Sequence, residues 1–207
     1  KEHLALKNLE AHVENIVRKS KQPEPHHLLC LASYRTLHEY DWHDLVVSSL
    51  SIEKVFTRQI LEPKREELLK QEIPLIEEIT DTVSSNVRNQ YEENPYPRWE
   101  NLGLPGSSSS ISKFLVDTQL RLVNHEILHN TAPQILIAGC GTGQHSIGTA
   151  ARFRNSNVLA IDLSLTSLAY ATRKCEDLGV DNIEHVQSDI LDLKKLDRQF
   201  DIIESAG

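Results

Sequence analysis

The sequence predicts an α/β protein in which a parallel, doubly wound sheet follows an α-helical region. Three observations lead to this fold class. A short apolar run, Ile135–Ala138, stops at a loop with three alternating glycines, which is typical of a buried strand that ends at a binding loop. Strand-like runs then alternate with helical patterns up to the end of the chain. The first 90 residues, in contrast, show helical periodicity.

The composition is that of a globular chain, since 39% of its 207 residues are hydrophobic and 25% are charged. The formal net charge of −8 argues against broad nucleic-acid binding, because phosphates attract basic surfaces. No apolar run approaches the roughly 20 residues that cross a bilayer, so we expect no membrane association. The cysteines, Cys30, Cys140 and Cys175, form no Cys-x-x-Cys pair, which favours a cytoplasmic location. Because the chain begins at Lys1, lacks Met and ends at Gly207 on a predicted strand, we expect an excerpt of a longer protein.

Four helices are expected in the first 90 residues, from the spacing of their apolar residues and from their prolines. We place them near Leu4–Ser20, His26–His43, Asp44–Leu61 and Pro63–Val87, the last with a kink at Pro74. Together they predict a helical bundle or cap.

A stiff aromatic segment, Tyr91–Trp99, follows and cannot be regular helix because it contains Pro95 and Pro97. Two interpretations stay open: a packing brace between the helical region and the sheet, or a lid whose aromatic faces contact a bound cation. The stretch Gly103–Ser110 has the composition of a linker and marks a domain boundary. We therefore expect a helical domain at 1–90, a connecting segment at 91–110 and a sheet domain at 111–207.

A helix over Ile111–Asn130 is expected to lead into the central strand. Within it, the stretch His125-Glu126-Ile127-Leu128-His129 matches the His-Glu-x-x-His pattern of zinc proteases. Such a site needs a third ligand on a following element, yet a buried strand and a glycine loop follow. We therefore predict no metal site.

The glycine loop, Gly139–Gln144, is the predicted binding site. Glycine admits positive φ and lets a ligand approach the backbone, while the following helix directs its first N–H groups at that ligand. Dinucleotide dehydrogenases carry Gly-x-Gly-x-x-Gly, whereas here Gln144 stands where the last of those glycines would be.

Three further strands are expected, over Asn157–Ile161, Asn182–Gln187 and Phe200–Glu204, and a helix from Ser164 to Gly179 separates the first two. Their alternation with helices indicates a parallel sheet whose ligands bind at the carboxyl ends of the strands.

Two carboxylates follow the ends of these strands. Asp162 can accept hydrogen bonds from both hydroxyls of a ribose. Asp189 can accept from an exocyclic amine while the N–H of Ile190 donates to a ring nitrogen, and this pair would recognise the edge of an adenine. Alternatively, Asp189 caps a helix.

Taken together, residues 134–207 resemble class I S-adenosylmethionine-dependent methyltransferases. Ala138–Gly143 is similar to the family's first motif, Asp162 to its ribose-binding acid, Ser188–Ile190 to its adenine-binding motif and Phe200–Glu204 to its fourth strand. The resemblance implies a Rossmann-like fold with S-adenosylmethionine as cofactor. The implied cofactor-binding residues are Gly139, Cys140, Gly141, Thr142, Gly143, Gln144, Asp162, Leu163, Ser188, Asp189, Ile190 and Glu204. The sequence departs from the family at Ile137, where an acidic residue often lies near the methionine amine.

The Tyr91–Trp99 segment, taken with Gly139–Gln144, is similar to a bacterial subfamily of tetratricopeptide-containing methyltransferases. The resemblance implies methyl transfer to an acceptor, which is a protein or a small molecule and which the sequence does not identify. It indicates no catalytic residue. In the complete family fold the sheet has seven strands ordered 3-2-1-4-5-7-6, so only the first four are expected here. We therefore expect the chain to be inactive alone and to associate through its exposed fourth strand.

Two other functions stay open. A catalytically inactive cofactor-binding or scaffold domain would share the fold, because fold does not fix function. The second alternative is an NAD-dependent dehydrogenase, although the spacing of the glycines argues against it.

Overall fold

The computed structural model describes residues 2–119, 121, 125–153 and 155–205. The chain divides into two compact units, residues 1–68 and 69–207. The boundaries expected near residues 90 and 110 stay predictions. Lys1 and Gly207, on which the expectation of an excerpt rests, lie outside the described residues.

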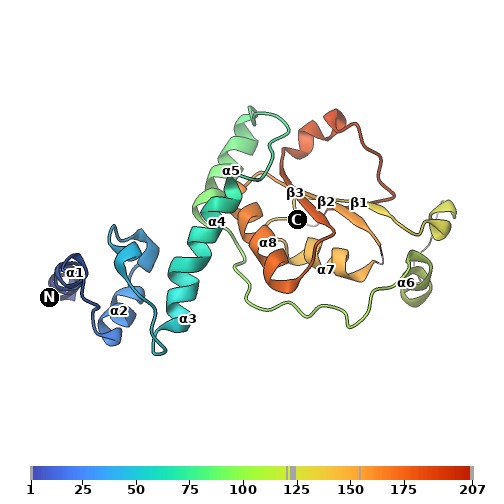
Figure 1. Cartoon of the computed structure of the whole chain (residues 1–207). Helices are drawn as coiled ribbons and strands as arrows, with labels where there is room; N and C mark the ends of the chain where they lie inside the picture. The colour runs from blue at the N-terminus through green and yellow to red at the C-terminus, as the bar shows by residue number, and fades with distance from the viewer. Residues whose placement is uncertain (1, 120, 122–124, 154, 206–207) are drawn as a thin grey trace. The chain divides into compact units, whose positions relative to one another are not determined.

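The first unit is helical, as expected, and consists mostly of short elements (Figure 1). They are α1 (Glu2–Arg18), α2 (Pro25–Ala32), the 3₁₀ helices η1 (Leu37–Glu39) and η2 (His43–Leu45), α3 (Glu53–Phe56), the π-helical turn η3 (Thr57–Leu61) and the start of α4 (Glu62–Lys70). Val13 and Val17 of α1 pack with Leu28 and Leu31 of α2 in a common core. This unit therefore has an apolar core of its own.

The continuous helices predicted over His26–His43 and Asp44–Leu61 are wrong. Thr36 and Val46 both have extended backbone, with ψ of 133°, and each interrupts one of these helices. Val46 and Ile52 nevertheless reach the core from irregular backbone. Their spacing therefore resembles that of a helix, although no continuous helix forms.

The single kinked helix predicted over Pro63–Val87 is also wrong, because an extended stretch separates α4 from α5 (Thr82–Glu93). The Ile76 N–H donates to the Gln187 carbonyl (3.1 Å), and the Gln187 N–H donates to the Pro74 carbonyl (2.9 Å). Proline is tolerated here because this pairing uses its carbonyl and needs no N–H from it. The stretch thus continues the sheet edge instead of kinking a helix.

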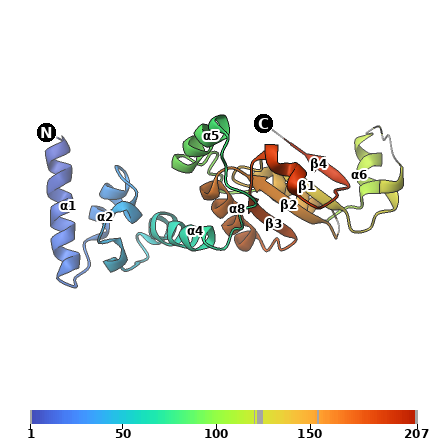
Figure 2. The ribbon, with the colours of Figure 1, turned by 90° about the horizontal axis from the view of Figure 1, so that it is seen from above.

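The second unit contains a parallel four-stranded sheet in the order β3-β2-β1-β4, which Figure 2 shows side by side. The strands are β1 (Gln134–Ala138), β2 (Asn157–Asp162), β3 (Ile183–Gln187) and β4 (Ile202–Glu204). Strand four pairs with strand one as predicted, and Ile137 lies opposite Glu204. The α/β class with a Rossmann-like parallel sheet is confirmed.

The remaining elements are α6 (Ile111–Thr118), η4 (Glu126–His129), α7 (Gln144–Arg152), α8 (Leu165–Leu178) and η5 (Ile190–Lys195). Alternate residues of β1 face opposite layers. Ile135 and Ile137 pack with residues of α6, α7 and α8, whereas Leu136 and Ala138 pack with residues of η5. The predicted limits of α8 are confirmed, because the Ser164 side chain accepts from the Ser167 N–H and a left-handed Gly179 ends the helix.

The helix predicted over Ile111–Asn130 is wrong beyond Thr118. Gln119 adopts a left-handed conformation (φ 55°) that ends α6, and the 3₁₀ helix η4 follows later. Residues 120 and 122–124 of the predicted helix lie outside the described residues. Because residues three apart share a face in a 3₁₀ helix, the spacing of His125 and His129 does not align them.

Strand β4 lies at one edge of the sheet and pairs, among the described residues, with β1. Its Ile203 side chain is 65% exposed. Association of two chains through this edge stays a prediction. In the described part of the chain, no helix is both long and apolar enough to cross a bilayer.

A buried histidine of β3 should make the stability of the protein depend on pH. His185 contacts the Thr172 hydroxyl through Nδ1 (3.1 Å), and its buried Nε2 has no partner among the described residues. Burial lowers the pKa of His185 to about 4. The unfolded chain binds this proton near pH 6.5 and the folded chain does not, so stability falls as the pH drops from 6.5 to 4.

The expected loss from this group is about 3 kcal/mol at most, from roughly 1.4 kcal/mol per pKa unit. Urea denaturation of the parent and of His185→Leu at pH 7 and pH 4 would measure it. The difference in free energy of unfolding between the two proteins should change by that amount between pH 7 and pH 4, because all other titratable groups are present in both proteins. Equal pH dependence of the two proteins would contradict the prediction.

Candidate functional site

The glycine loop joins β1 to α7 at the carboxyl end of the sheet. All three of its glycines have positive φ: 79° at Gly139, 53° at Gly141 and 84° at Gly143. The N–H groups of Gly139 and Cys140 both donate to the Ile161 carbonyl at 2.9 Å. The loop is therefore a sharp turn tied to the end of β2.

The three glycines differ in the space around them. A Cβ at Gly143 would lie 2.5 Å from the Ala171 Cβ of α8. A Cβ at Gly141 would meet no atom within 4 Å, and one at Gly139 would meet the Ile190 Cδ1 at 3.8 Å. Gly143 thus permits close helix packing, whereas the backbone at Gly139 and Gly141 is open to a ligand.

Asp162 ends β2 beside this loop. Its Oδ2 accepts from the Gly141 N–H (2.7 Å) and its Oδ1 accepts from the Ser164 N–H (2.9 Å). A carboxylate offers about four acceptor positions, so each oxygen can also accept from a hydroxyl. Burial raises the pKa of Asp162, and the charge of Glu92 acts in the same direction, while the backbone N–H groups oppose both.

The segment after β3 lies next to Asp162, because the Ser188 N–H donates to the Asp162 carbonyl (3.0 Å). Asp189 is buried, and its Oδ1 caps η5 by accepting from the Leu191 N–H (2.9 Å). The cap interpretation of Asp189 is therefore correct, yet no described residue bonds its Oδ2. Ile190 is 48% exposed and its Cδ1 extends toward Gly139.

Three other predicted residues have supporting positions. Cys140 is buried, and burial raises the pKa of its thiol well above the usual range, so the thiol is neutral. The Leu163 carbonyl accepts from the Gln187 side chain (2.8 Å). Gln144 is exposed at the first position of α7.

The aromatic segment docks on the glycine loop. The Thr142 hydroxyl donates to the Pro97 carbonyl (2.7 Å), and the Trp99 indole N–H donates to the Thr142 carbonyl (3.0 Å). The Tyr170 hydroxyl of α8 donates to the Trp99 carbonyl, and the two rings meet edge to face. Trp99 is therefore a packing brace, whereas Tyr96 is 77% exposed.

Glu92, at the end of α5, caps the N-terminus of α8. Its carboxylate accepts from the N–H groups of Leu165 (2.5 Å) and Thr166 (3.0 Å), and also from the Thr166 hydroxyl. A negative charge is favourable at a helix N-terminus. This contact was not predicted from the sequence, because the partners lie 73 residues apart and no local pattern links them.

Glu204 ends β4 and contacts α7. Its Oε2 lies 2.6 Å from the His145 Nε2 and accepts from the Thr149 hydroxyl at 2.9 Å. Glu204 was predicted as a cofactor-binding residue, whereas its two partners were not predicted. His145 and Thr149 are four residues apart on one helix face, and this spacing beside the loop was the available signal.

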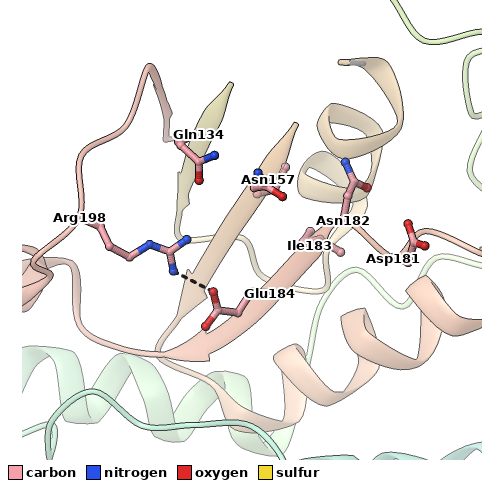
Figure 3. A pocket seen from close by; sticks show the side chains of 8 residues that line it. Gln134, Asn157, Asp181, Asn182, Ile183, Glu184 and Arg198 are labelled. Carbon is pink, nitrogen blue, oxygen red and sulfur yellow. Dashed lines mark hydrogen bonds and ion pairs between the residues drawn. The ribbon is translucent and has the colours of Figure 1, made fainter. Parts of the chain in front are cut away.

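A cavity of about 300 Å³ lies at the opposite end of the sheet from the glycine loop, where the strands begin (Figure 3). It is lined by Gln134, Asn157, Val158, Asp181, Asn182, Ile183, Glu184 and Arg198. Arg198 forms an ion pair with Glu184 (2.8 Å) there. Ligands of parallel α/β sheets bind at the carboxyl ends of the strands, so we assign the candidate site to the glycine loop.

Comparison with known proteins agrees with this assignment. Residues 135–207 match a family model described as a methyltransferase domain. The match supports class I S-adenosylmethionine-dependent methyltransferases as the class and S-adenosylmethionine as the cofactor.

Two curated proteins and one solved structure are similar to part of this chain. An uncharacterized protein of Synechococcus sp. is 38% identical over 76 residues, which are 36% of this chain and 18% of the relative. A tRNA (guanine-N(7)-)-methyltransferase of Porphyromonas gingivalis is 29% identical over 75 residues, 36% of this chain and 30% of the relative. The solved structure of PKMT2 from Rickettsia typhi in complex with AdoHcy is 31% identical, with a TM-score of 0.34, over 36% of this chain and 15% of that one. The chain thus spans less than a third of each of these relatives.

The structure brings the predicted residues to one end of the sheet. Gly139–Gln144, Asp162, Leu163, Ser188–Ile190 and Glu204 all end or follow strands there. Among the residues that the structure describes, no group of three or more His, Cys, Asp or Glu is arranged to hold a metal ion.

Proposed function

We propose that the carboxyl end of this sheet binds S-adenosylmethionine and that the protein transfers the methyl group to an acceptor. One observation carries the proposal. The strand order β3-β2-β1-β4 sets Asp189, Asp162, the glycine loop and Glu204 in succession along one edge of the sheet. The cofactor is a linear molecule with a matching succession of adenine, ribose, sulfonium and amino-acid end.

The residues fit these groups chemically. The Asp189 Oδ2 can accept from the adenine amine while the Ile190 N–H donates to the ring, and the Ile190 side chain supplies an apolar surface near Gly139. Asp162 can accept from the ribose hydroxyls with the positions that its two backbone bonds leave open. The open backbone at Gly141 allows close approach of the sulfonium region.

The bound cofactor supplies an electrophilic methyl group. The chain itself binds and orients this group against the acceptor, an effect that can contribute roughly 7–11 kcal/mol. A general base is needed only if the acceptor must lose a proton, and the acceptor, a protein or a small molecule, is unidentified. We therefore assign no catalytic residue.

We further propose that the chain belongs to the tetratricopeptide-containing methyltransferases and acts in the cytoplasm. The two stretches that carry this resemblance contact each other, since Pro97 and Trp99 both bond Thr142.

Asp162→Ala should weaken binding of S-adenosylmethionine at least ~10-fold, because two charge-assisted bonds to the ribose would be lost. Isothermal titration calorimetry on the intact protein would measure the affinity. Asp181→Ala is the matched control, because Asp181 is an exposed acid at the other end of the sheet. Unchanged affinity in Asp162→Ala, with its melting temperature preserved, would refute the proposed site.

A further inference from the structure

We infer that Glu92 is a specificity-determining residue and that, together with Asp162, it excludes nucleosides that carry a phosphate on the ribose. This role rests on the proposed function, which places the ribose at Asp162. It adds the class of ligand that this end of the site rejects.

The N-terminus of α8 lies beside the proposed ribose position, because α8 begins at Leu165 and Asp162 ends β2 just before it. A helix N-terminus commonly binds phosphate, since its first four N–H groups lack intrahelical acceptors. In dinucleotide-binding sheets, residues near the corresponding strand end decide whether a ribose 2′-phosphate is accepted. Whether this helix end has donors to offer is therefore decisive for the ligand.

Two of the four N–H groups are satisfied by local side chains. The Ser164 N–H donates to the Asp162 Oδ1 (2.9 Å). The Ser167 N–H donates to the Ser164 hydroxyl oxygen (3.0 Å). The first bond within the helix runs from the Leu168 N–H to the Ser164 carbonyl (3.0 Å). Two N–H groups of the first turn thus remain for another acceptor.

Glu92 takes both of them from a distant part of the chain. Its carboxylate accepts from the N–H groups of Leu165 (2.5 Å) and Thr166 (3.0 Å), and also from the Thr166 hydroxyl. With Glu92 in place, every first-turn N–H of α8 has an acceptor from the protein. A phosphate on the ribose would find no free backbone donor at this helix end.

The same contacts bring two negative charges together. Asp162 and Glu92 bond the N–H groups of consecutive residues, Ser164 and Leu165. Burial raises the pKa of Asp162, and the charge of Glu92 acts in the same direction, as expected for neighbouring carboxylates. Among the described residues, neither acid has a cationic partner. A phosphate, which carries about −1.5 to −2 charge at pH 7, would be repelled here, whereas ribose hydroxyls are neutral donors.

A purely structural cap would not need this charge. Neutral Ser and Asn side chains satisfy helix N–H groups as well as acids do, and Ser164 already caps α8 locally. The two roles differ in a measurable way. Loss of a structural cap weakens all nucleosides alike, whereas loss of a specificity residue changes the ratio between two of them.

The test compares S-adenosylhomocysteine with its ribose 2′-phosphate, which differ only in the phosphate. In calorimetry on the intact parent protein, the phosphate should weaken binding by at least ~100-fold. Glu92→Ala frees two N–H donors and removes one charge, so this ratio should fall by ~10–100-fold. An unchanged ratio in folded Glu92→Ala, or equal binding of both ligands by the parent, would overturn the inference. If the parent does not bind S-adenosylhomocysteine, the proposed function itself fails.

Glu92→Gln separates the charge from the cap and keeps the test valid if the alanine variant does not fold. The amide oxygen can still accept from both N–H groups, but the negative charge is gone. The ratio should therefore fall by ~3–10-fold, less than in Glu92→Ala. A ratio in folded Glu92→Gln equal to that of the parent would show that the charge excludes nothing.

Glu93→Ala is the matched control, because Glu93 is the adjacent, exposed acid at the end of α5. It removes the same charge one residue away from the cap and should leave the ratio within ~2-fold of the parent. If Glu93→Ala lowers the ratio as much as Glu92→Gln does, the effect belongs to the general charge of α5 and the assignment to Glu92 is wrong.

Discussion

Replacing Gly143 with alanine should destabilise the second unit by about 2–5 kcal/mol, from roughly 1–2 kcal/mol of left-handed strain and 1–3 kcal/mol of overpacking. The new methyl group would lie 2.5 Å from the Ala171 Cβ and 3.2 Å from its Cα. Both atoms belong to the interior of α8, so α7 and α8 must move apart. Thermal and urea denaturation would measure the loss.

Gly141→Ala is the control for this prediction. Gly141 also has positive φ, but a methyl group there meets no atom within 4 Å. It should therefore cost only the backbone strain, about 1–2 kcal/mol. Ala171→Gly in the Gly143→Ala background should recover part of the loss by removing the contacting methyl group. Equal destabilisation by the two single alanine variants would show that packing against α8 is not what requires glycine at 143.

Replacing Trp99 with alanine should destabilise the protein by about 3–5 kcal/mol, because a buried aromatic side chain is removed. Trp99 is 8% exposed, packs on Tyr170 and donates to the Thr142 carbonyl. Cofactor affinity should also fall, since the glycine loop loses a contact that holds Thr142. Trp99→Phe separates these contributions, because it keeps most of the packing and removes only the N–H donor.

Tyr96→Ala is the matched aromatic control. Tyr96 is 77% exposed, so its loss should change the free energy of unfolding by less than about 0.5 kcal/mol. Weaker cofactor binding in this variant would support the lid interpretation for Tyr96. If folded Trp99→Phe binds the cofactor with unchanged affinity, then Trp99 has only a packing role.

The sheet and most of the candidate site are predictable because their signals are local. A strand of four or five apolar residues, a run of alternating glycines and an acid at a strand end each occupy fewer than ten residues. Gly179 and Ser164 end and begin α8 through contacts within one helical turn. The pairing of strand four with strand one, in contrast, was expected only from the resemblance to the methyltransferase family, because the alternation of elements does not determine strand order.

The parts that sequence reasoning missed depend on distant partners. Pro74 was expected to kink a helix, yet its carbonyl pairs with Gln187 of β3. Glu92 was expected only as part of an aromatic segment, yet it caps a helix more than 70 residues away. Apolar spacing reports that a residue is buried, and it does not report whether a helix or an irregular backbone carries that residue inward.

The bond between Trp99 and the Thr142 carbonyl turns the indole into a natural optical probe. The emission of an indole depends on the polarity and hydrogen bonding around its N–H, and here that N–H ends on the glycine loop. The chain has two tryptophans, and the other, Trp42, is buried in the first unit and stacked on Tyr40. In a Trp42→Phe background the fluorescence of the protein would come from one indole at the loop. Ligand titrations and the kinetics of loop rearrangement can then be followed by stopped-flow fluorescence without any attached label.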